Sequence, residues 1–208
     1  TVVDIKGKER VESVTLAQVD ENRKPIPGTE EEYTCDTLLL SVGLIPENEL
    51  SDKLGVQLHP VTGGPVVNES LETSIPGVFA CGNVLHVHDL VDFVSQEATM
   101  AGNCAAAYVK TGRTEETEEI PVKCGSGVRY TVPAKIRPAY MEEKLPVRFR
   151  VGQVYQKASI TVRSGDTVLL RKKRPIMAPG EMETVYIKKD SLSPDNIGND
   201  ITISVEEE

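Results

Sequence analysis

One segment, residues 73–84, constrains the fold of this chain more than any other. A Pro-Gly turn leads into a short apolar run, residues 78–81, and the run ends at Gly82. A run of this kind is typical of a buried parallel strand, and ligands of open α/β sheets bind at the carboxyl ends of the strands. Gly82 lets the backbone approach a ligand closely, and Asn83 adds an amide beside it. We therefore expect a ligand site at Gly82 and Asn83.

A helix is predicted directly downstream, over residues 91–110, and Gly112 ends it. Its first residues, Val91, Asp92 and Phe93, have backbone N–H groups without partners inside the helix. The positive end of the helix dipole favours electron-rich groups, so we expect the start of this helix to face the same ligand.

The region before the apolar run predicts further strands. Residues 37–42 form a continuous apolar run suited to a central strand, and Gly43 and Pro46 interrupt it. Alternating segments further upstream predict an antiparallel meander over residues 1–5, 10–19 and 31–34, with a turn at 21–28.

The sequence changes character between residues 111 and 119, where Thr-Glu repeats replace the apolar periodicity, and this change predicts a domain boundary. Downstream, short apolar or alternating pieces are separated by Gly, Pro, Asp or Asn. They predict strands over residues 128–132, 147–151, 158–162, 167–170, 185–188 and 201–205. This density of short strands favours an immunoglobulin-like β-sandwich, and Gly165 predicts a hairpin turn.

Two motifs carry a resemblance to a known family. Residues 73–83 resemble the pattern T-S-x-P-G-V-F-A-x-G-D, and residues 36–48 resemble D-x-v-l-x-a-x-G-x-x-P-N. Both are similar to motifs of the FAD-dependent pyridine nucleotide-disulfide oxidoreductases, thioredoxin reductase-like members especially. The resemblance covers about residues 1–112. It implies that FAD and NAD(P)H are the cofactors.

The resemblance also implies roles for individual residues. The family's aspartate, which hydrogen-bonds a ribityl hydroxyl of FAD, falls on Asn83, next to Gly82. The Val84 N–H would lie near the pyrophosphate. The helix start at Val91, Asp92 and Phe93 would lie beside the flavin ring.

The fold class that follows is α/β plus all-β, a partial FAD/NAD(P)-binding region followed by the sandwich. Residues 1–45 would be the end of the NAD(P)-binding domain, 46–112 the carboxyl-terminal half of the FAD-binding domain, and 113–208 the β-sandwich. No G-x-G-x-x-G occurs in the 208 residues. We therefore expect a carboxyl-terminal fragment of a longer enzyme. The fragment alone should bind FAD weakly or not at all, and copies should pair across exposed sheet edges.

The expected function is transfer of electrons between NAD(P)H and an acceptor, either a small molecule or a protein. The alternative is a non-catalytic β-sandwich module that docks a partner dehydrogenase subunit. Residues 175–183 contain two methionines and two prolines, and form either an adaptable contact surface or a packed loop.

The loop between the apolar run and the helix contains His86, His88 and Asp89. The first interpretation is a loop whose polar tips face solvent or cap the helix through Asp89. The second makes His86 or His88 a catalytic proton donor to reduced flavin or substrate. A metal site is the weakest of the three, since no third ligand is evident in the sequence.

Composition excludes several other classes. The four cysteines form no C-x-x-C pair, so no redox dithiol is expected in this chain, and Cys124 is the expected exposed thiol. A net charge of −9 argues against a nucleic-acid partner. The basic residues 171–174 are interpreted as a solvated strand end. No apolar run reaches the roughly 20 residues of a membrane helix, and no signal peptide is apparent, so a cytoplasmic location is expected.

Overall fold

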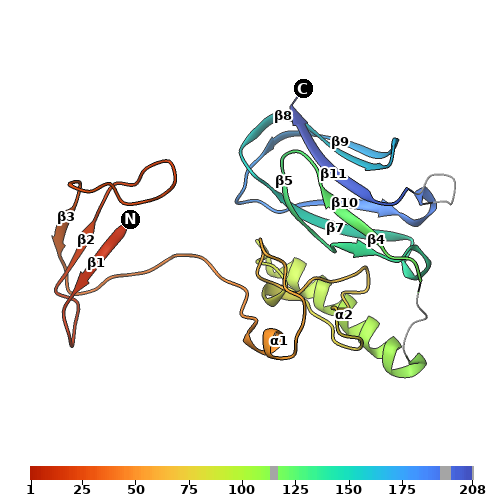
Figure 1. The fold of residues 1–208 in the computed structure, drawn as a ribbon, viewed down its shortest axis with the longest axis horizontal. Helices are drawn as coiled ribbons and strands as arrows, with labels where there is room; N and C mark the ends of the chain where they lie inside the picture. The colour runs from red at the N-terminus through yellow and green to blue at the C-terminus, as the bar shows by residue number, and fades with distance from the viewer. Residues whose placement is uncertain (113–116, 193–197, 208) are drawn as a thin grey trace. The chain divides into compact units, whose positions relative to one another are not determined.

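A computed structural model describes residues 1–112, 117–192 and 198–207 of the chain. The chain forms two compact units, Thr1–Gly43 and Leu44–Glu208, and Figure 1 shows the elements of each. Residues 113–116, within the predicted domain boundary, lie outside the described part. None of the described helices is long and apolar enough to cross a membrane.

The first unit is the predicted antiparallel meander. Its strands are β1 (Val2–Lys6), β2 (Ser13–Leu16) and β3 (Glu31–Thr34), hydrogen-bonded in the order β1-β2-β3. The prediction of three strands is confirmed, although the middle strand is shorter than the alternation suggested.

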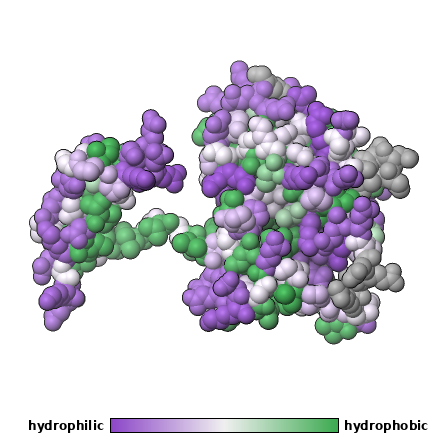
Figure 2. All heavy atoms as spheres, viewed as in Figure 1, coloured by the Kyte–Doolittle hydropathy of each residue, from purple (hydrophilic) through white to green (hydrophobic). Residues whose placement is uncertain are grey.

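The predicted central strand over residues 37–42 is wrong. The segment is extended but assigned to no strand, and Leu39 and Val42 are 89% and 84% exposed. The apolar linking stretch is visible in green in Figure 2. A strand exists only with a hydrogen-bonded neighbour, and no described segment of the first unit pairs with this one. The predicted buried parallel strand at residues 78–81 is also wrong, because Phe79 makes an isolated antiparallel bridge to Glu72 and the run belongs to none of the described sheets.

The helical part of the second unit comprises α1 (Glu49–Lys53), the 3-10 turn η1 (Gly82–Val84) and α2 (Val91–Thr111). The predicted helix is confirmed, including its end at Gly112, whose φ of 80° suits glycine. The buried or half-buried side of α2 repeats at helical spacing and includes Phe93, Glu97, Met100, Ala101, Cys104 and Tyr108. The charged Glu97 therefore lies on the side that packs inward.

The rest of the second unit is two β-sheets. One has the strand order β10-β7-β5, and the other has the order β6-β4-β11-β8-β9, in which β11 and β4 are parallel. Their bounds are β4 (Ile120–Cys124), β5 (Val128–Val132), β6 (Lys135–Ile136), β7 (Lys144–Val151), β8 (Tyr155–Ser164), β9 (Thr167–Met177), β10 (Glu183–Lys188) and β11 (Ile201–Glu207). Short 3-10 turns lie at η2 (Pro138–Tyr140) and η3 (Lys189–Ser191).

One hydrophobic core joins the two sheets. Val147 and Phe149 of β7 belong to the same buried cluster as Ile160 of β8 and Ile203 of β11. All six predicted strands are confirmed, and so is the hairpin at Gly165. Strands β4 and β6 were not predicted, because β4 contains Pro121 and β6 has only two residues. The immunoglobulin-like type of the sandwich stays a prediction.

Candidate functional site

The predicted ligand turn is a tight turn around Gly82. Its φ of +71° lies in the region that favours glycine, and an added Cβ would lie 3.3 Å from Cγ1 of Val94 in α2. The N–H groups of Leu85 and His86 donate to the Gly82 carbonyl at 2.9 and 3.2 Å, which closes the turn. The Gly82 N–H donates to Oε2 of Glu97 at 2.7 Å. The turn and α2 are therefore directly connected.

Asn83 and Val84 have different environments. The Asn83 side chain is exposed, and its Oδ1 accepts the backbone N–H of His88 at 3.1 Å. Its Nδ2 has no hydrogen bond to the described protein atoms, so it can donate to a hydroxyl group of a ligand. The Val84 carbonyl accepts from Asn48 Nδ2 at 2.8 Å. The same Nδ2 binds the Gly63 carbonyl at 2.9 Å and so ties the turn to a second loop.

The start of α2 lacks a side-chain cap. Leu90 occupies the N-cap position and makes no side-chain hydrogen bond there. Val91 is 74% exposed and Asp92 is exposed, whereas Phe93 is half-buried. The Phe93 N–H donates to the Leu90 carbonyl at 3.2 Å. The N–H groups of Val91 and Asp92 are therefore the ones that could meet an acceptor from outside.

The interpretation of the histidine loop as solvent-facing is wrong. His86 is 1% exposed and His88 is 9% exposed. Asp89 does not cap α2, because its carboxylate binds Arg150 and accepts the Met182 N–H. Residues of the sandwich cover the loop, and these contacts bury it.

Glu97 is the residue at the centre of the buried loop, and the sequence analysis missed it. Its carboxylate lies 3.1 Å from Nε2 of His86, 3.3 Å from Nε2 of His88 and 3.2 Å from Nη1 of Arg148. Burial alone would raise the pKa of Glu97, but the neighbouring His86 and His88 side chains lower it to about 2. A signal was present in the sequence, since Glu97 interrupts an otherwise apolar helix stripe.

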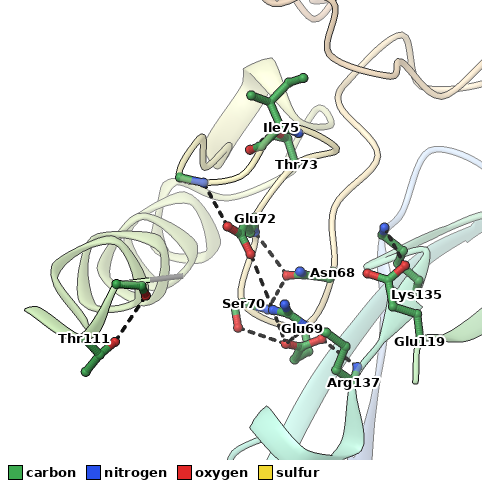
Figure 3. Close-up of polar contacts among 12 residues, drawn as sticks. Asn68, Glu69, Ser70, Glu72, Thr73, Ile75, Thr111, Glu119, Lys135 and Arg137 are labelled. Atoms are coloured by element: carbon green, nitrogen blue, oxygen red, sulfur yellow. Dashed lines mark hydrogen bonds and ion pairs between the residues drawn. The ribbon is translucent and has the colours of Figure 1, made fainter. Parts of the chain in front are cut away.

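A second buried ion pair joins the sandwich to the loop at residues 68–72. Arg137 donates to the Glu69 carboxylate from its backbone N at 2.7 Å, from Nε at 3.0 Å and from Nη2 at 2.8 Å. Nη2 also lies 3.6 Å from Glu72. Figure 3 shows both carboxylates pointing toward Arg137, with Asn68 bracing the loop between them. No local pattern in the sequence predicted this pair.

A pocket of about 300 Å³ adjoins the loop in the second unit. The lining is apolar at residues 44–46 and Val61 and polar at His86, Arg129, Tyr130 and Arg150. The Arg150 side chain is already engaged by Tyr130 Oη, the Val87 carbonyl and Asp89.

The methionine-containing segment at residues 175–183 is only partly a loop, because residues 175–177 end β9 and residues 178–182 connect β9 to β10. Met177 is fully buried in the sandwich core, and Arg150 binds the carbonyls of Pro179 and Gly180. The Met182 N–H donates to Asp89 at 2.6 Å. The segment therefore makes contacts within the chain.

Gly64 allows the Gly-rich turn to pack against the histidine loop. A Cβ built on Gly64 would lie 1.7 Å from the Leu85 carbonyl oxygen, a backbone atom that cannot rotate away. We expect Gly64→Ala to lower the unfolding free energy by about 1–3 kcal/mol. The neighbouring Gly63→Ala has space for its Cβ but a φ of +70°, so a smaller loss of about 1 kcal/mol is expected. Equal losses in urea titrations would contradict the steric explanation.

The cysteines give no redox pair. All four are free, and Cys124 is the exposed one, as predicted. Burial raises the pKa of the thiols of Cys81, Cys104 and Cys124. Raised pKa values disfavour the thiolate, so these thiols are poor nucleophiles at neutral pH.

A glycine turn with positive φ thus lies beside an uncapped helix start, and comparison with known proteins gives the family. The family model described as pyridine nucleotide-disulphide oxidoreductase matches residues 2–108. The chain belongs to this family, which confirms the resemblance. Members of the family use FAD and NAD(P)H.

Three individual relatives support the same family. The chain is 30% identical over 114 residues to a ferredoxin–NADP reductase of Picrophilus torridus, covering 52% of this chain and 33% of that protein. It is 32% identical over 109 residues to an NADH oxidase of Methanocaldococcus jannaschii, covering 52% and 20%. A thioredoxin reductase of Treponema pallidum is 27% identical over 112 residues, covering 53% and 34%. The chain thus spans about a third or less of the length of these relatives.

Proposed function

We propose that this chain forms the carboxyl-terminal, flavin-side part of an FAD-dependent oxidoreductase that passes electrons between NAD(P)H and an acceptor. The observation that carries the proposal is the Gly82 turn beside the uncapped start of α2, within a segment that matches the family. The absence of G-x-G-x-x-G from the 208 residues supports a first FAD-binding motif located outside them.

The residues of the site fit FAD. The positive φ of Gly82 lets the backbone approach the cofactor, and Asn83 Nδ2 is available to donate to a ribityl hydroxyl. The exposed N–H groups at Val91 and Asp92 would face the electron-rich edge of the ring. The bound cofactor would supply the two-electron chemistry, and the protein would orient it and exclude water.

The test is uptake and reduction of flavin by the polypeptide that contains both this chain and the first FAD-binding motif. We expect that it binds FAD in a 1:1 ratio and that its visible absorbance bleaches when NADH or NADPH is added without oxygen. A colourless protein that takes up no FAD would contradict the proposal and favour the alternative, a module that docks a partner dehydrogenase subunit.

Asn83→Ala is expected to weaken FAD binding by about tenfold in that polypeptide. It removes a donor to the cofactor and the acceptor of the His88 N–H, and one hydrogen bond contributes about 1 kcal/mol. Asn83→Asp is the matched control, because a carboxylate still accepts the His88 N–H and can accept from a ribityl hydroxyl. The measurement is FAD titration followed by flavin fluorescence. Equal affinity of Asn83→Ala and the parent would place the cofactor elsewhere.

A further inference from the structure

Glu97 connects the sandwich to the Gly82 turn through one carboxylate. Oε1 accepts from Nη1 of Arg148 on β7 at 3.2 Å, and Oε2 accepts from the Gly82 N–H at 2.7 Å. The Glu97 side chain is 0% exposed and the Arg148 side chain 7% exposed. Strand β7 is therefore connected to the turn by two hydrogen bonds, both to the buried carboxylate of Glu97.

The charges of this cluster are balanced. The low pKa of Glu97 keeps it ionised at neutral pH. Burial lowers the pKa of His86, an effect that outweighs its hydrogen bond to Glu97, so this ring is neutral. The guanidinium of Arg148 is the cation that lies against the buried carboxylate, at 3.2 Å. A buried carboxylate without such a partner would be strongly unfavourable.

The same cluster has the donor types of a metal site, since ligand atoms of His86, His88 and Glu97 lie within 4.8 Å of one another. Two features argue against an ion. The Nδ1 atoms of both histidines lack hydrogen-bond partners in the described structure, whereas a metal-bound histidine almost always donates its other N–H to an acceptor. The guanidinium of Arg148 also binds the carboxylate that would ligate the ion. The geometry therefore favours a buried ion pair between Glu97 and Arg148.

We propose that Arg148 is a positioning residue of the flavin site: from the sandwich it orients Glu97, which fixes the backbone of the Gly82 turn. This inference rests on the proposed function, because the turn matters for flavin only if the turn holds FAD. Through Arg148, the sandwich would help to assemble the cofactor site. Glu97 binds the Gly82 N–H through Oε2, while Oε1 is held by Nη1 of Arg148 at 3.2 Å together with Nε2 of His86 at 3.1 Å. Arg148 is the one of these two partners that comes from the sandwich.

The first test needs no cofactor and uses the 208-residue chain. Hydrogen exchange of the Gly82 amide is measured relative to that of Ile203 in the sandwich core, so that global destabilisation cancels. We expect Arg148→Met to accelerate the relative exchange of Gly82 by about tenfold, and Arg148→Lys to restore part of the protection because it keeps the charge.

Two other arginines serve as matched controls. Arg174 pairs with the buried Glu183 at 2.7 Å inside the sandwich, and Arg137 pairs with Glu69 at a different contact between the sandwich and the preceding residues. Arg174→Met and Arg137→Met should leave the relative exchange of Gly82 within about twofold of the parent. Acceleration of equal size in Arg137→Met would mean that loosened docking suffices, and would overturn the proposal.

The second test measures FAD affinity in the polypeptide that carries both FAD-binding motifs. Arg148→Met is expected to raise the Kd for FAD by about tenfold and to shift the visible flavin spectrum, whereas Arg174→Met changes neither. If the parent binds no FAD, the proposed function fails while the exchange result still stands. If the parent binds FAD and Arg148→Met binds it equally well, the positioning role fails. A stoichiometric metal ion that is lost in His86→Ala would also overturn it.

Discussion

Arg137→Met is expected to lower the free energy of unfolding by about 3–5 kcal/mol, the usual result of removing one partner from a buried ion pair. Glu69 is 2% exposed and Glu72 is 7% exposed, so both carboxylates would remain buried next to an apolar side chain. The backbone N–H of residue 137 would still donate to Glu69, but the two guanidinium bonds would be lost. The loop at residues 68–72 should loosen first.

The control for this prediction lies close to Arg137. Lys135 pairs with Glu119 at 2.8 Å, but the two side chains are 28% and 42% exposed, and Figure 3 shows this pair apart from the Glu69 cluster. Lys135→Met should therefore cost less than about 1 kcal/mol. Urea unfolding of both variants measures the two losses of unfolding free energy. A loss below 1 kcal/mol in Arg137→Met would show that the buried pair does not hold the loop.

Acidification is expected to destabilise the second unit in two steps, both through the Glu97 cluster. The pKa of His86 is lowered from 6.5 by burial, so the unfolded chain binds more protons than the folded chain just below pH 6.5. Stability is therefore complete above pH 6.5 and declines as the pH falls through that region.

Glu97 contributes to the pH dependence of stability over a lower pH range than His86. Its pKa falls from 4.5 to about 2 on folding, so its contribution is complete above pH 4.5 and is lost between pH 4.5 and 2. A shift of this size corresponds to roughly 3 kcal/mol.

Glu97→Gln tests this assignment directly. The variant should be less stable above pH 4.5, because Arg148 would be left buried without its counter-charge, and should lose less stability than the parent between pH 4.5 and 2. Glu119→Gln is the control, since this exposed carboxylate should leave the pH profile unchanged. Denaturant titrations across the pH range provide the measurement. Parallel profiles of Glu97→Gln and the parent would show that another group carries the acid sensitivity.

Local patterns in the sequence predicted much of the fold. Helix α2 and its end at Gly112 follow from helical periodicity and a glycine stop, which depend only on neighbouring residues. Six of the eight sandwich strands in the described residues follow from alternation interrupted by turn residues. By contrast, the apolar run at residues 37–42 forms no strand, because pairing requires a second segment that local pattern cannot supply.

Some residues of the candidate site could likewise be predicted from local sequence patterns, and others could not. Gly82, Asn83 and the family to which they point could be predicted from the sequence, because a tight turn and a helix start are local features with a recognisable residue order. The burial of His86 and His88 around Glu97, and the position of Arg148 on β7 beside that carboxylate, became apparent from the folded structure alone. Residues 97 and 148 belong to segments far apart in the chain, so their pairing depends on how the sandwich packs against α2. The burial of a charge is likewise set by the elements around it, and no local pattern specifies those.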